Sequence, residues 1–196
     1  AHRSRAPLAS RHPVHITLKL RREIGSLRTK RKVQVLRRAL AAHESRKDAR
    51  PVARVIHWSI QRDHIHLICE AKNQHALSRG IQGLSIRIAK RLNGLLGRKG
   101  PVFQDRYHAH ILRSPREVRN ALLYVLNNVR KHAAQRGKML AALSIDIYSS
   151  APTFNGWRDL PEHLRGIGPP LSVASTWLLR VGWRRHGLLS INDVPG

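Results

Sequence analysis

The sequence predicts an α+β fold in which a four-stranded antiparallel sheet carries helices mainly on one face. Segments with the two-residue period of strands alternate with segments of helical period, in the order strand, helix, strand, strand, helix, strand. The two middle strands are separated by only a tight connection, which favours an antiparallel hairpin. A chain of 196 residues can bury a sizeable core without stabilising cross-links.

The first half of the predicted sheet alternates apolar and polar side chains along its strands, as half-buried strands do. Its members in chain order are a strand over 14–20, a helix over 27–44, a strand over 53–60 and a strand over 64–70. In the helix, Val33, Leu36 and Leu40 share one face, and arginines and lysines surround them.

The second half adds a long helix, a strand over about 107–112 and a last helix. The long helix repeats apolar side chains at steps of three and four, at Leu77, Ile81, Leu84, Ile88, Leu92 and Leu95. Ser114, Pro115 and Glu117 form a helix start, with a capping serine, a first-turn proline and a capping-box glutamate. The last helix is expected to run to about Ala134, with a core stripe of Val118, Leu122, Val125 and Val129. This element order is the ferredoxin-like one.

Composition divides the chain into three parts. Residues 1–12 form a basic arm without a core-forming pattern, and residues 13–142 hold the α+β domain. From 143 to 196 the sequence is rich in Ser, Pro and Gly, and we expect an extension of short elements that docks through Trp157, Trp177 and Trp183.

Charge narrows the class of partner. The chain has 37 Lys and Arg against 11 Asp and Glu, a net charge of +26, which disfavours self-association and makes a polyanion the natural partner. One cysteine excludes a disulfide framework and a multi-cysteine zinc site. Apolar runs are too short for a membrane span, and no signal peptide is visible, although the chain starts at Ala1 without a methionine. We expect a soluble protein that faces nucleic acid.

Two histidines on the third strand are the first candidate site residues. If Ile65 and Leu67 face the core, His64 and His66 project together from the opposite face. Two imidazoles on one rigid strand can share a metal ion. The alternative is a pair of surface histidines on an open sheet face.

The last helix carries a tyrosine and an asparagine one turn apart. Tyr124 and Asn128 lie on a polar stripe with Asn120 and Lys131, beside the apolar stripe. Tyr124 is either a boundary residue with its hydroxyl in water or a nucleophile on a rigid element. With the histidine pair, the amide oxygen of Asn128 would complete a centre for metal-assisted phosphoryl transfer.

These segments resemble a known family. RDHIHLICEA resembles the His-hydrophobic-His strand of the HUH endonucleases, and RYHAHILRSPREVRNALLYVLNNVRKH resembles the downstream segment of their single-tyrosine transposases. The group is that of the REP-associated tyrosine transposases, and the similarity covers residues 12–135. It implies that Tyr124 is the nucleophile and that His64, His66 and Asn128 bind Mg²⁺ or Mn²⁺. The family's Asn-Pro is replaced here by Asn128-Val129, which removes a helix stop.

The resemblance also implies the reaction. An enzyme of this family cleaves and rejoins single-stranded DNA through a 5′-phosphotyrosine, here at hairpin-bearing, REP-like sequences. Tyr107 and Tyr148 are rival nucleophiles, and the second pair, His108 and His110, is assigned to structure or DNA contact. We expect a bacterial cytoplasmic, nucleoid-associated protein with no membrane partner, as a monomer or a homodimer.

Two other functions remain open. The first is a non-catalytic nucleic-acid-binding protein, either a domesticated HUH domain or an RNA-binding domain, for which the charge and a ferredoxin-like sheet are sufficient. The second is a nickase of the replication-initiator or relaxase kind. A pure binder has no use for His64, His66, Tyr124 and Asn128 together, which favours the transposase.

Overall fold

One antiparallel sheet organises the chain. The computed structural model describes residues 7–44, 53–135, 137, 144–166 and 172–196. The strands are β1 (Val14–Lys19), β2 (Arg54–Ile60), β3 (His64–Glu70) and β4 (His108–Ile111). Their order is β2-β3-β1-β4 with every neighbouring pair antiparallel, which is the ferredoxin-like order. The predicted fold class is confirmed.

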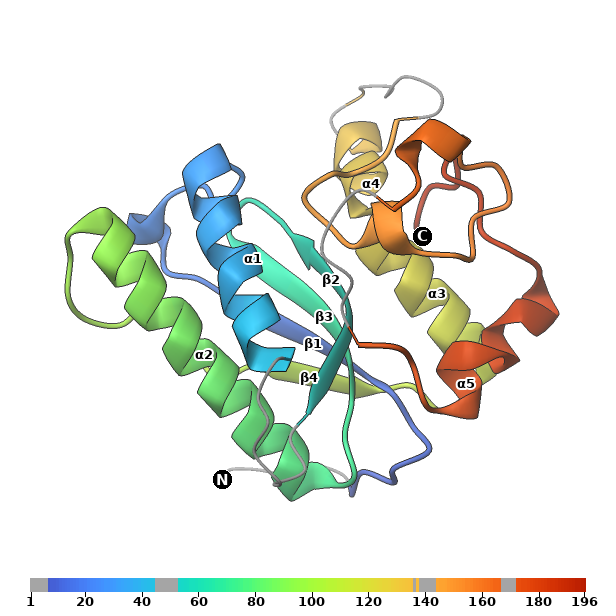
Figure 1. Cartoon of the computed structure of the whole chain (residues 1–196), viewed down its shortest axis with the longest axis horizontal. Helices are drawn as coiled ribbons and strands as arrows, with labels where there is room; N and C mark the ends of the chain where they lie inside the picture. Colours follow the sequence, from blue (N-terminus) through green and yellow to red (C-terminus); the bar gives the residue numbers. More distant parts are fainter. Residues whose placement is uncertain (1–6, 45–52, 136, 138–143, 167–171) are drawn as a thin grey trace.

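The two long helices cover one face of the sheet (Figure 1). They are α1 (Lys30–Glu44) and α2 (Gln74–Leu96), which pack on each other and on alternate strand side chains such as Ile16, Ile65 and Leu67. The predicted α2 stripe is buried from Leu77 to Leu92. Asn73 caps α2, because its side chain accepts a hydrogen bond from Ala76 N at 2.9 Å.

The opposite face is covered by α3 (Pro115–Leu126) and the chain that follows it (Figure 1). Ser114 caps α3 as predicted, although Glu117 accepts from the backbone of Arg113 rather than from that of Ser114. The second core includes α5 (Trp177–Arg180) and buries Trp157 and Trp183 against α3. The remaining short helices are 3₁₀ turns at Arg22–Ile24, Ala151–Thr153, Glu162–Leu164 and Gly182–His186.

The helix that the sequence predicts to continue to Ala134 is broken at Asn127. The prediction is wrong here: α3 ends at Leu126, and α4 spans Asn128–Ala134. The side-chain amide of Asn127 donates hydrogen bonds to the carbonyl oxygens of three residues near the end of the chain, Ser190, Ile191 and Asp193. These contacts hold the break, and Val129 is half-buried instead of joining the core stripe.

The edge of β2 is covered by a segment from far along the chain. The backbone N–H of Ile60 donates to Tyr148 O at 2.8 Å, and that of Ser150 donates to Trp58 O at 2.9 Å. Residues 148–150 therefore run beside β2 and satisfy backbone groups that an open edge would expose.

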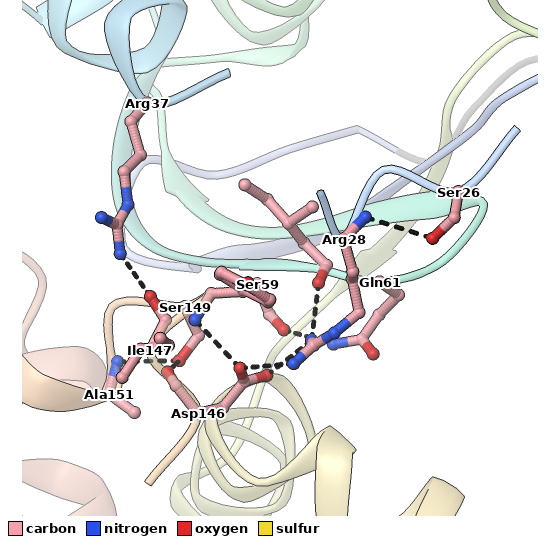
Figure 2. Close-up of polar contacts among 11 residues, drawn as sticks. Ser26, Arg28, Arg37, Ser59, Gln61, Asp146, Ile147, Ser149 and Ala151 are labelled. Atoms are coloured by element: carbon pink, nitrogen blue, oxygen red, sulfur yellow. Dashed lines mark hydrogen bonds and ion pairs between the residues drawn. The ribbon is translucent and has the colours of Figure 1, made fainter. Parts of the chain in front are cut away.

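An ion pair closes the same corner of the molecule (Figure 2). Arg28, which precedes α1, donates from both terminal nitrogens to the carboxylate of Asp146, at 3.0 and 2.8 Å, and also to Ile60 O at 2.9 Å. The Asp146 side chain is 1% exposed. A buried carboxylate of this kind depends on its bidentate partner, so the pair fixes the segment after residue 144 to the sheet.

Three sequence predictions concern the chain ends and surface. The first six residues of the predicted basic arm over 1–12, and most of the predicted boundary near 142, lie outside the described residues. The expectation that all three C-terminal tryptophans dock is wrong for Trp177, which is 48% exposed. Within the described part of the chain, no helix is long and apolar enough to cross a membrane.

Candidate active site

The two histidines of β3 lie together beneath α3. Ile65 and Leu67 are buried in the core on the α1–α2 side of the sheet, so His64 and His66 project from the other side. Their ring centroids are 4.6 Å apart. The alternative of two histidines on an open sheet face does not apply to His66, which is 3% exposed.

His66 is held as a neutral ring with one nitrogen free. Its Nδ1 lies 3.1 Å from Nε2 of His15 and 3.2 Å from Oγ1 of Thr17, both on β1. A proton on Nδ1 satisfies this contact and leaves the Nε2 lone pair, which is buried without a hydrogen-bond partner among the described residues. Burial, followed by the charges of His15, His64 and His132, lowers the pKa of His66 to about 2.

His64 is oriented by the residue before it. Its Nδ1 lies 2.8 Å from Oδ1 of Asp63, which directs Nε2 away from the carboxylate. Burial raises the pKa of Asp63, but the hydrogen bond with His64 and the charges of His64 and Lys19 outweigh it and lower that pKa overall. An ionised carboxylate on the far nitrogen is a common way to fix a metal-binding imidazole.

Tyr124 meets this cluster from α3. Its ring centroid lies 5.1 Å from that of His66 and 5.8 Å from that of His15, and both contacts are edge-on. Lys131, on α4, places its Nζ 5.0 Å from the centre of the Tyr124 ring. The half-buried tyrosine opens onto a cavity of about 550 Å³ that is also lined by His15, His110 and Asn120.

Asn128 differs from its sequence prediction. We expected it on a polar stripe, but it is fully buried at the start of α4. Neither its amide oxygen nor its amide nitrogen has a hydrogen-bond partner among the described residues. A buried amide without partners lowers the stability of the fold. Asn128 lies one helical turn before His132, whose ring centroid is 6.3 Å from that of His64.

These donors fit a divalent metal ion. Two unpaired buried groups, Nε2 of His66 and the amide of Asn128, come from the two elements that meet at the cluster. Neutral imidazole nitrogen and amide oxygen are ordinary metal ligands. Across the described ranges, no three His, Cys, Asp or Glu side chains are grouped to hold a metal. A site at His64 and His66 would take a third donor of another kind, for which the amide of Asn128 is the candidate.

Comparison with known proteins identifies the fold. No protein-family model and no curated protein matches the sequence. Among solved structures, the chain superimposes on a REP-associated tyrosine transposase bound to a REP hairpin, with a TM-score of 0.55 and 18% identity over 76% of this chain and 82% of that one. The chain shares the fold of a REP-associated tyrosine transposase. A candidate transposase from Deinococcus radiodurans R1 scores 0.39, at 13% identity over 58% of this chain and 85% of that one, and does not bear on the fold.

The resemblance to the REP-associated transposases predicted from residues 12–135 is thus confirmed in the fold. The structure brings His64, His66 and Tyr124 together and places Asn128 on the adjoining helix. Their roles as metal ligands and nucleophile stay predictions.

The rival tyrosines lie elsewhere in the fold. Tyr107 and Tyr148 both pack against the core on the α1–α2 side of the sheet. The Tyr107 hydroxyl is 3.1 Å from Oγ of Ser78 on α2, and the guanidinium of Arg28 lies over the ring of Tyr148 at 4.6 Å. Both therefore lie on the side of the sheet opposite to the one from which His64 and His66 project.

Sequence reasoning missed the residues that support the site. His15 and Thr17 lie on β1, which pairs with both β3 and β4, so Thr17 is directly opposite His66 and His15 is opposite His110. Only the strand order reveals this. The signal available in the sequence was the alternation of His15 and Thr17 with the buried residues of that strand.

Proposed function

We propose that this chain is a metal-dependent single-stranded DNA endonuclease and transposase that cuts and rejoins DNA through Tyr124. One observation carries the proposal: the ring of Tyr124 lies against the ring of His66, whose Nε2 is buried and unpaired, and the helix that follows buries the unpaired amide of Asn128. A protein that only binds nucleic acid has no need for unpaired buried polar groups beside a tyrosine.

In the cleavage step, Oη of Tyr124 attacks the scissile phosphorus, and the bond from phosphorus to the 3′ oxygen breaks. The products are a 5′-phosphotyrosine and a strand with a free 3′-hydroxyl, whose proton replaces the one lost by the phenol. In rejoining, a 3′-hydroxyl attacks the phosphotyrosine and Tyr124 leaves. Each step exchanges one phosphate ester for another, so the reaction needs no nucleotide cofactor.

The neighbouring side chains have distinct roles in this proposal. Lys131 holds a positive charge over the Tyr124 ring, which would stabilise the negative charge that develops on the phenol as its oxygen becomes a nucleophile. His15 and Thr17 orient His66, and Asp63 orients His64. A divalent ion held by His64, His66 and Asn128 would polarise the scissile phosphate.

For the substrate we propose single strands that carry a hairpin. The solved transposase of the same fold is bound to a REP hairpin. The net charge of +26 suits a phosphate backbone, and an unpaired strand can enter the cavity beside Tyr124.

A labelled hairpin-bearing oligonucleotide incubated with the protein and Mg²⁺ or Mn²⁺ tests the proposal on a denaturing gel. We expect nicking and a covalent adduct whose peptide mass maps to Tyr124. Tyr124→Phe keeps the ring and its packing, so it should fold but form no adduct. An adduct on Tyr107 or Tyr148, or nicking by Tyr124→Phe at the parent rate, rejects the assignment. Binding without nicking under both metals supports the non-catalytic alternative.

A further inference from the structure

Trp177 is the exception among the four tryptophans of the chain. Trp58, Trp157 and Trp183 are 1%, 2% and 1% exposed, whereas Trp177 is 48% exposed. The exposed indole is nevertheless held in place, because its ring packs directly on Gly182. The contact is so close that a Cβ at this position would lie only 2.7 Å from the ring. A large aromatic side chain that is both fixed and exposed indicates a contact surface.

Arginines surround this indole. The guanidinium of Arg185 lies over the Trp177 ring at 4.8 Å, and Arg180 is exposed on the same short helix. Arg184 donates a hydrogen bond to Oδ1 of Asn155 at 3.0 Å. No aspartate or glutamate occurs in the sequence from position 163 to 192, so no acidic residue of this segment neutralises the positive charge.

A pocket adjoins these arginines. Its volume is about 350 Å³, and its walls combine aromatic rings with hydrogen-bonding groups, from His57, Phe154, Asn155, Arg180, Trp183 and Arg184 among others. The volume lies within the range of small-ligand sites. Aromatic walls with a few polar groups suit a nucleobase, and arginines at the rim suit its phosphate.

We propose that α5 and the turn Gly182–His186 form an accessory binding surface for single-stranded DNA. An unpaired base stacks on the Trp177–Arg185 pair, while Arg180 and Arg184 contact phosphates. Val173 and Val181 are also exposed and suit an apolar protein partner, but the arginines, in a segment without acidic residues, favour a polyanion.

The surface is within reach of a strand held at Tyr124. Arg119 on α3 donates from Nε to Gly187 O at 3.4 Å, so the end of the proposed surface contacts the helix that carries the tyrosine. Arg119 precedes Tyr124 by five positions, which is roughly 7 Å along an α-helix. The proposal rests on the DNA-binding part of the proposed function and is independent of cleavage.

Tryptophan fluorescence tests it without any cleavage step. The parent protein is titrated with a short unstructured oligonucleotide in metal-free buffer, and acrylamide quenching is measured with and without DNA. Because three of the tryptophans are buried, we expect the DNA to quench Trp177 and to protect it from acrylamide. Fluorescence and acrylamide access that do not change at saturating DNA, with binding followed by anisotropy, overturn the proposal.

Variants separate stacking from general charge. Trp177→Ala should weaken oligonucleotide binding at least about fivefold, and Trp177→Phe should weaken it less while abolishing the fluorescence change. Arg180→Gln with Arg184→Gln should flatten the salt dependence. Arg22→Gln with Arg106→Gln, at two exposed positions outside the long helices and the C-terminal turns, is the matched charge control. Parent-like affinity in Trp177→Ala, or an equal loss in the control, rejects the surface. Nicking by the parent on hairpin DNA is scored separately, so failure of this surface and failure of the enzyme are distinguishable.

Discussion

At the scale of single residues, the orientation of the His66 ring is set by the hydrogen-bond partners of its Nδ1. Nδ1 is engaged by His15 and Thr17 from β1, so Nε2 is aimed and left unpaired. Side chains that hydrogen-bond the second nitrogen of a metal-binding imidazole change its affinity for the metal more than they change the stability of the fold.

His15→Gln is therefore expected to raise the metal concentration needed for half-maximal nicking about 10- to 100-fold. Excess metal should restore much of the rate, whereas His66→Ala should abolish nicking at any metal concentration and retain most of the DNA affinity. A metal titration of the nicking rate for both variants measures this. A parent-like titration curve for His15→Gln would show that His15 does not position His66.

The buried histidines also make stability depend on pH. Burial lowers the pKa of His57 to about 4 despite the opposing charge of Glu70, and its ring packs edge-on against Phe154 with centroids 5.2 Å apart. The unfolded chain takes up a proton near pH 6.5, but the folded chain does so only near pH 4. The contribution of His57 to the free energy of unfolding is thus fully present above pH 6.5. It is lost as the pH falls towards 4, by up to about 1.4 kcal/mol per pH unit.

Urea unfolding at a series of pH values measures this effect. His57→Gln should have a shallower acid slope than the parent, and the same substitution of the exposed His75 on α2 should leave the slope unchanged. An identical slope in His57→Gln would mean that folding does not lower the pKa of His57.

At the scale of elements, the break between α3 and α4 sets the geometry of the site. Tyr124 lies in the last turn of α3 and Asn128 begins α4. Asn127, between the two helices, is hydrogen-bonded to three carbonyl groups near the end of the chain. The distance between the proposed nucleophile and the proposed ligand therefore depends on contacts made by Ser190, Ile191 and Asp193.

Asn127→Ala should lower the free energy of unfolding by about 2–3 kcal/mol, because buried carbonyls lose their donor. Nicking should decline as well, since the break loses its support. Asn120→Ala, at an exposed position on α3, is the stability control and should be near neutral. Urea midpoints for the two variants decide the point, and equal midpoints contradict the proposed support of the break.

Elements with local signals could be predicted, and elements fixed by distant contacts could not. The third strand has the predicted bounds, and the α2 stripe and the Ser114 cap are confirmed, because periodicity and capping are properties of neighbouring residues. The helix break was missed because its hydrogen bonds come from residues more than 60 positions away. The burial of Asn128 follows from that break.

At the scale of the whole molecule, the positive charge dominates the expected binding behaviour. Arginines and lysines spread over both long helices and the C-terminal turns, against only 11 acidic residues in the chain. Affinity for single-stranded DNA should fall steeply between low and moderate salt, with a logarithmic slope of roughly −0.7 per phosphate contacted. Anisotropy of a labelled oligonucleotide measured at increasing NaCl gives the slope, and a flat response would exclude a charge-driven interface.

One face of the sheet is covered by residues that come late in the sequence, and this affects how the chain folds as it is synthesised. The α1–α2 layer draws its buried apolar residues from positions up to 102, so most of it can form while the rest is still being translated. The layer that holds Tyr124 needs Trp157, Trp183 and Leu189, and β2 needs residues 148–150 for its edge. A nascent chain at residue 140 therefore has its α1–α2 layer in place and its opposite layer incomplete, and Tyr124 acquires its surroundings only after Leu189 has been added.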